Sequence, residues 1–126
     1  MSWNDIIDQY LIKTGAVSKA AICGFDGSIW GKSDNFKLEE SEAAAASQCF
    51  KSKDFVLGTG VVLEGVKYYV LQADDERVIG RKGSSGFFIY TSNRAVIISV
   101  YEDGLLPGTC SKATGALADY FKTINY

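Results

Sequence analysis

Residues 60–101 read GVVLEGVKYYVLQADDERVIGRKGSSGFFIYTSNRAVIISVY, and this stretch decides the fold. Short runs rich in valine, isoleucine and aromatic residues alternate with breaks at 64–65, 74–76 and 91–93. Such runs favour strands, and polar or glycine-containing breaks favour turns. Because short turns join strands that run in opposite directions, the stretch predicts an antiparallel meander.

The segment before the meander predicts another hairpin and a helix. The apolar runs 20–25 and 28–32 flank Asp26-Gly27, and Asp-Gly between two such runs is a strong hairpin signal. Residues 39–50 begin with acidic side chains, which suit a helix N-terminus, and continue with alanines, which favour helix strongly.

Helical spacing also marks the beginning of the chain. Residues 3–13 place apolar side chains at the i, i+3, i+4 and i+7 positions of one helix face. Ser2 and Asp5 have the spacing of a capping box, and Gly15 is expected to end the helix.

A further helix is expected at the other end of the chain. Pro107 should break the preceding strand, Thr109 or Ser111 should cap the helix, and helical spacing continues to Ile124. No linker or repeat divides the sequence, so we expect one α+β domain over residues 1–126. An antiparallel sheet with a helix at each chain end needs covering, so both end helices should pack on one face.

Composition argues against several classes of protein. A formal charge of −2 disfavours non-specific binding of nucleic acid, which needs a basic surface. The absence of histidine removes the usual general base and the Ser-His and Cys-His pairs, so no enzyme is expected. A small hydrolase or transferase with Asp74 or Glu39 as its base remains an alternative. No apolar run has bilayer length and no secretory signal is visible, which predicts a cytoplasmic protein.

The three cysteines, Cys23, Cys49 and Cys110, lie far apart and without C-x-x-C spacing. This pattern predicts buried apolar side chains, not a disulfide framework or a zinc site. No other metal or cofactor site is expected.

Three polar or glycine-rich motifs have a plain structural interpretation. The glycines within 80–86 lack phosphate-loop spacing and precede a strand, which favours a hairpin. Asp74-Asp75 is expected to be a solvated turn. Arg81-Lys82 is either a soluble strand edge or a contact to an acidic partner or anionic lipid.

Trp3, Trp30, Tyr120 and Tyr126 form the most informative set of side chains. Buried aromatic residues usually belong to a core, but Trp3 begins a helix and Tyr126 is the last residue. Trp and Tyr can expose an apolar face while their polar atoms stay in water. Such a surface suits a polyproline II ligand, which loses little entropy on binding.

The sequence resembles profilin over residues 1–126. The resemblance rests on the order and spacing of six stretches: MSW at 1–3, GAVSKAAI at 15–22, the hairpin that ends in Trp30, ADD at 73–75, GRKG at 80–83 and LADY at 117–120. It implies a central antiparallel sheet with the terminal helices on one face and smaller helices on the other. It also implies a cytoskeleton-associated monomer that regulates actin polymerisation.

The resemblance implies three partners: monomeric actin, proline-rich proteins and phosphoinositide lipid. In profilins the proline-rich ligand lies between the terminal helices and the neighbouring sheet, a site that corresponds here to Trp3, Ile6, Trp30, Tyr120, Phe121 and Tyr126. Many relatives carry tyrosine where this chain has Ile6, so binding is expected to be weaker or differently selective.

The implied actin-binding residues are Gln72, Arg81, Lys82, Arg94 and Lys112. The family commonly has basic residues where this chain has Gln72, Glu76, Thr91 and Ala116, and often tyrosine where it has Ile79. Fewer positive charges should slow association with an acidic partner and weaken attraction to anionic lipid. The alternative is therefore a divergent proline-rich-ligand adaptor with weak or no actin and phosphoinositide binding.

Overall fold

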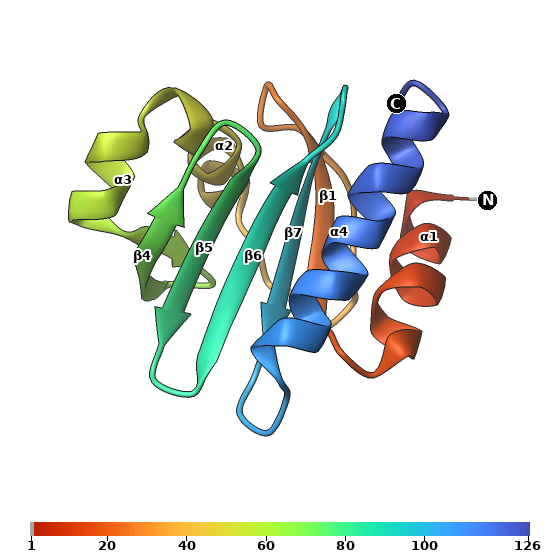
Figure 1. The fold of residues 1–126 in the computed structure, drawn as a ribbon, viewed down its shortest axis with the longest axis horizontal. Coiled ribbons are helices and arrows are strands. Elements are labelled where there is room, and N and C mark those ends of the chain that lie inside the picture. The colour runs from red at the N-terminus through yellow and green to blue at the C-terminus, as the bar shows by residue number, and fades with distance from the viewer. Residues whose placement is uncertain (1) are drawn as a thin grey trace.

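The computed structural model describes residues 2–126; Met1, which begins the expected domain and the MSW motif, lies outside the described residues. A single seven-stranded antiparallel sheet has the order β2-β1-β7-β6-β5-β4-β3 (Figure 1). The strands are β1 (Lys19–Gly24), β2 (Ile29–Lys32), β3 (Val61–Leu63), β4 (Val66–Ala73), β5 (Arg77–Lys82), β6 (Ser85–Thr91) and β7 (Ala95–Tyr101). The predicted hairpin and meander are confirmed.

Helices cover both faces of the sheet. The α-helices are α1 (Trp3–Tyr10), α2 (Glu40–Ser47), α3 (Lys53–Thr59) and α4 (Pro107–Thr123). One core cluster joins α1 and α4 to one face, and a second joins α2 and α3 to the other. Figure 1 shows α1 and α4 side by side in front of the strands. The predicted placement of both end helices on one face is confirmed.

The first helix begins as predicted. The Ser2 hydroxyl accepts a hydrogen bond from the Asp5 N–H (3.1 Å), and the Asp5 carboxylate accepts one from the Ser2 N–H (3.3 Å). The α-helix ends at Tyr10, before the predicted residue 13, because the chain tightens into a 3₁₀ turn at Ile12–Thr14. Gly15 then ends the turn with a left-handed φ of 76°.

The start of the last helix corrects a prediction. Pro107 does not break the chain before the helix; it is the first helical residue. Proline suits this position because its missing N–H would have no partner there and its φ is already helical. Leu106 is the N-cap without a side-chain bond, and the Thr109 hydroxyl donates to the Leu106 carbonyl (2.9 Å). Neither Thr109 nor Ser111 is the cap.

The middle helices agree in part with the sequence. The helix predicted at 39–50 divides into α2 and a 3₁₀ turn at Cys49–Lys51. The next helix, α3, was not predicted, because Phe55 and Leu57 are exposed and only Val56 is buried. A helix with so little buried surface leaves no apolar stripe in the sequence.

Two smaller expectations are confirmed. The glycine-rich stretch is a hairpin whose strands β5 and β6 meet at 83–84, and a Cβ at Gly80 would overlap the Phe87 ring. All three cysteines are free and buried. Burial raises the pKa of the Cys23 and Cys110 thiols to about 12 and that of Cys49 to about 11.

Candidate functional site: an aromatic groove between the terminal helices

Four aromatic rings from three separate parts of the chain meet at one end of the α1–α4 pair. The Trp3 ring lies 4.9 Å from Trp30, 5.3 Å from Tyr126 and 5.9 Å from Phe121, between ring centroids. Trp30 and Tyr126 also meet, at 5.7 Å. We call these four rings the aromatic cluster.

The α1 side of the cluster is fixed by close contact with β2. The Asn4 side-chain oxygen accepts a hydrogen bond from the Lys32 N–H at 3.0 Å, which ties the first turn of α1 to the strand. A Cβ at Gly31 on β2 would lie 2.6 Å from the Asn4 side-chain oxygen, so only glycine allows α1 to approach β2 this closely. The helix therefore holds Trp3 directly beside the strand that carries Trp30.

Trp30 is oriented by the hairpin before it. The indole N–H donates to the Ser28 hydroxyl at 3.2 Å, and that hydroxyl donates to the Asp26 carboxylate at 2.7 Å. The hydrogen bond from the Ser28 hydroxyl, followed by that from the Ser28 N–H, lowers the pKa of Asp26. The carboxylate stays ionised at neutral pH and accepts the bond from the Ser28 hydroxyl, which in turn accepts the bond from the indole N–H.

Tyr126 is fixed by the turn between β6 and β7. Its N–H donates to the Phe121 carbonyl at 2.7 Å, and its main-chain oxygen accepts bonds from the Ser92 hydroxyl (3.2 Å) and the Arg94 N–H. The Arg94 guanidinium lies 5.0 Å from the Tyr126 ring centroid, within cation–π range. The C-terminal residue is thus held in place by four contacts.

The cluster borders a hollow of about 390 Å³. The hollow is lined by Trp3, Ile6, Tyr10, Tyr120, Phe121, Ile124 and Tyr126. Phe121 is buried and forms its floor, whereas Tyr120 is 48% exposed at its rim. Five of the six residues predicted for proline-rich binding line it, and Trp30 joins them through its ring contacts.

Tyr10 and Ile124 are lining residues that were not predicted. Tyr10 was interpreted only as part of the apolar face of the first helix, and Ile124 as part of the last. The signal for Tyr10 was present, since it follows Trp3 by seven residues and so lies on the same helix face.

The five residues predicted for actin binding are all exposed, but the structure does not bring them together. Gln72 lies on β4 and Arg81 and Lys82 lie on β5, beside the open part of the sheet. Lys112 is on α4 and lines a hollow between that helix and the strands. Arg94 lies at the opposite end of β6 from Lys82 and contacts the Tyr126 ring, and its role in actin binding stays a prediction.

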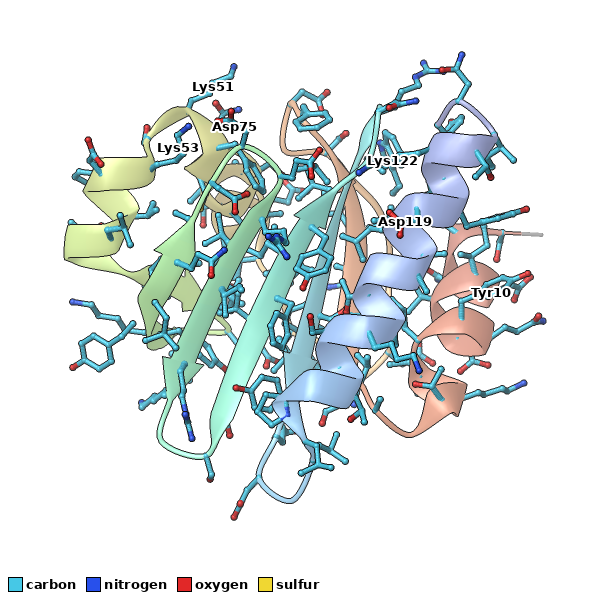
Figure 2. All side chains as sticks on the ribbon, in the orientation of Figure 1. Tyr10, Lys51, Lys53, Asp75, Asp119 and Lys122 are labelled. Carbon is cyan, nitrogen blue, oxygen red and sulfur yellow. The ribbon has the colours of Figure 1, made fainter. Side chains whose placement is uncertain are left out.

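The hollow beside α4 carries charges of both signs. Glu76 and Lys122 approach to 3.8 Å across it, and Asp119 and Arg77 also line it. Figure 2 shows Asp119 and Lys122 on the side of α4 that faces the open strands, with Tyr10 on the other side of that helix. The aromatic groove and this mixed-charge surface therefore lie on opposite sides of α4.

The two carboxylates considered as catalytic bases are bonded to the backbone. One Asp74 oxygen accepts bonds from the Glu76 and Arg77 N–H groups, both at 2.9 Å. The bond from Glu76 is the main reason that the pKa of Asp74 is lowered. Glu39 caps α2 through a reciprocal box with Glu42. Both carboxylates thus have structural partners.

Among residues 2–126, no helix combines the length and apolarity that crossing a bilayer requires.

The chain thus folds into a helix-covered antiparallel sheet with an exposed aromatic groove between its terminal helices. Residues 1–126 match the protein family described as Profilin. The chain belongs to the profilin family, which confirms the resemblance seen in the sequence.

Individual profilins agree over nearly the whole length. Caenorhabditis elegans Profilin-3 is 61% identical over 126 residues, which is 100% of both chains. The solved structure of Acanthamoeba castellanii profilin IA superposes with a TM-score of 0.95 at 34% identity, covering 99% of this chain and 100% of that one. A solved complex of LokiProfilin1 with rabbit actin shares the fold, with a TM-score of 0.77 at 20% identity and coverage of 95% and 93%.

Proposed function

We propose that this chain binds proline-rich segments in the aromatic groove and monomeric actin on the surface beside α4, and so regulates actin polymerisation as a cytoskeletal adaptor. The observation that carries the proposal is the aromatic cluster, in which Trp3, Trp30 and Tyr126 meet although they come from distant parts of the chain. The proposed mechanism is differential binding, without bond chemistry and without a cofactor.

The groove has the properties that a polyproline II ligand needs. Trp3, Ile6, Trp30 and Tyr126 are each partly exposed, so ring faces and an apolar side chain remain available. Pyrrolidine rings pack on such faces, and the ligand is already extended before it binds. The indole of Trp30 is held by Ser28, so little side-chain freedom is lost on binding.

The proposed actin surface comprises the exposed side of β4 and β5 and the adjoining side of α4. Arg81 and Lys82 supply positive charge at one end, and Lys112 supplies it from α4. Arg81 is oriented by a bond from its Nε to the Gly83 carbonyl (2.9 Å). An acidic partner would be attracted to these groups. We place Arg94 outside this surface because it covers Tyr126.

The second candidate function is an adaptor that keeps the groove but binds actin and phosphoinositide weakly or not at all. The observation that favours it is the mixed charge beside α4, where Glu76 pairs with Lys122 and Asp74 with Arg77, each at 3.8 Å. Each neutralised base removes attraction to an anionic surface, worth about 1 kcal/mol per Lys or Arg near a membrane.

Replacing Trp3 tests the groove. We expect Trp3→Ala to weaken the binding of a proline-rich peptide by a free energy of about 2 kcal/mol or more, because a central ring contacts the other three. Calorimetric titration of wild type and variant measures the change. Phe55→Ala is the matched control, since Phe55 is an exposed aromatic residue on α3, on the opposite face. Unchanged affinity in a folded Trp3→Ala protein would refute the assignment.

A further inference from the structure

The aromatic hollow does not end at its rim but adjoins a second hollow between α1 and α4. The second hollow, of about 520 Å³, is lined by Tyr10, Thr14, Ala16, Thr109, Lys112, Ala113, Ala116, Leu117 and Tyr120. Tyr10 and Tyr120 line both hollows, so the two adjoin at this pair of residues. We call the second hollow the apolar extension.

Tyr10 and Tyr120 form the bridge between the two hollows. Their rings are stacked, with centroids 6.1 Å apart and an angle of 23° between planes. Both side chains remain about half exposed, at 45% and 48%. The stacked pair thus presents aromatic surface to a ligand that passes over it, at little cost in side-chain freedom.

The spacing along the helices matches the repeat of a polyproline II ligand. Trp3 and Tyr10 are seven residues apart on α1, as are Ala113 and Tyr120 on α4. Seven helical residues rise about 10 Å, and one turn of polyproline II, three residues, rises about 9 Å. A ligand parallel to α1 would therefore present the same face to Trp3 and, one turn later, to Tyr10.

We propose that the apolar extension binds one further turn of the proline-rich ligand, about three residues beyond those held by the aromatic cluster. The proposal rests on the proposed function of the groove. Its occupant is a continuation of the same extended chain, because the two hollows share their bridging residues and small alanines line the second. Tyr10 is the residue that determines the preference for ligand length.

The test compares two oligoprolines, one of about six residues and one of about twelve, which span roughly 19 and 37 Å. Longer peptides also gain from multiple binding registers, so the readout is the ratio of the two affinities in wild type and in each variant. Tyr10→Ala should weaken the longer peptide about threefold to tenfold more than it weakens the shorter one. Tyr69→Ala is the matched control, because Tyr69 is an exposed tyrosine on β4, far from the groove.

A second variant keeps the test decisive if Tyr10 also affects the first hollow. Ala113 lines the apolar extension and not the aromatic hollow, so the negative charge of Ala113→Glu should lower the affinity ratio in the same way. If wild type binds the short peptide and neither variant changes the ratio, the extension is refuted while the groove stands. Failure of wild type to bind either peptide would instead refute the proposed function. Self-association that Tyr10→Ala abolishes would assign the hollow to a second copy of the chain.

Discussion

At the scale of single residues, the Glu64 carboxylate links three separate segments of the chain. One of its carboxylate oxygens accepts a bond from Lys19 Nζ and the other from the Lys37 N–H, both at 2.8 Å. Glu64 itself has a left-handed φ of 55° in the turn between β3 and β4. The carboxylate therefore joins this turn to β1 and to the segment before α2.

These contacts make stability depend on pH. Burial raises the pKa of Glu64, but the hydrogen bonds from Lys19 and Lys37 lower it more, so the pKa falls below its ordinary value. Because the pKa of Glu64 is lower in the folded state than in the unfolded state, its ionisation stabilises the folded state. This contribution is fully present at pH values above the unfolded-state pKa, which is about 4.3 for glutamate. That contribution disappears as the pH falls through the folded-state pKa.

We expect Glu64→Gln to lower the free energy of unfolding by about 1–2 kcal/mol at neutral pH, because it leaves Lys19, which is partly buried, without its anion. The difference from wild type should shrink as the pH falls below about 4. Urea unfolding across this range measures it, with Glu40→Gln, an exposed residue on α2, as the control. A difference that stays constant with pH would contradict the role of the ion pair.

Residue roles differ in how far the sequence predicts them. The capping box of Ser2 and Asp5 is local, and its spacing alone was sufficient. The role of Arg94 in actin binding stays a prediction based on its charge, but its contact with Tyr126 depends on which end of the sheet holds the turn after β6. The pairing of strands over the whole sheet determines that end, and the positions of charged residues in the sequence do not reveal this pairing.

At the scale of elements, burial explains which predictions succeeded. The central strands β6 and β7 are covered on both faces and are almost entirely buried, so they read as continuous apolar runs. Strand β4 has alternating buried and exposed residues over its first half and was equally recognisable. Helix α3 exposes its large apolar residues and was not predicted. The start of α4 was predicted wrongly because proline can either interrupt a strand or occupy the first position of a helix, and Pro107 does the latter.

The first turn of α1 is the element on which the groove depends most. We expect Ser2→Ala to lower the free energy of unfolding by about 1 kcal/mol, since the Asp5 N–H loses its acceptor. It should also weaken proline-rich binding severalfold, because Trp3 follows the cap directly. Denaturant unfolding and peptide titration measure the two effects.

The matched variant is Ser2→Asp, which keeps a side-chain acceptor at the cap. It should restore both stability and affinity to near the wild-type values. If alanine and aspartate behave alike, the cap does not hold Trp3 in place.

At the scale of the whole molecule, the fold separates two surfaces with one helix. The stacked Tyr120 lies on the groove side of α4, and Asp119 and Lys122 lie on the side of the open strands. Because both terminal helices pack on the same face of the sheet, the beginning and the end of the chain meet in the groove. The sequence predicts that aromatic residues from both ends share one surface, and the packing shows that Trp3, Trp30 and Tyr126 are in contact.

Because the aromatic groove and the surface beside the open strands share no lining residue, both proposed partners should bind at once. The most direct measurement is the affinity for monomeric actin, by sedimentation velocity, with and without a saturating oligoproline of about six residues, which does not reach Lys112 in the apolar extension. We expect binding in the micromolar range that the peptide does not change, that Trp3→Ala leaves intact, and that charge reversal at Arg81 and Lys82 weakens about tenfold. Displacement of actin by the peptide, or the absence of actin binding in wild type, would contradict the account.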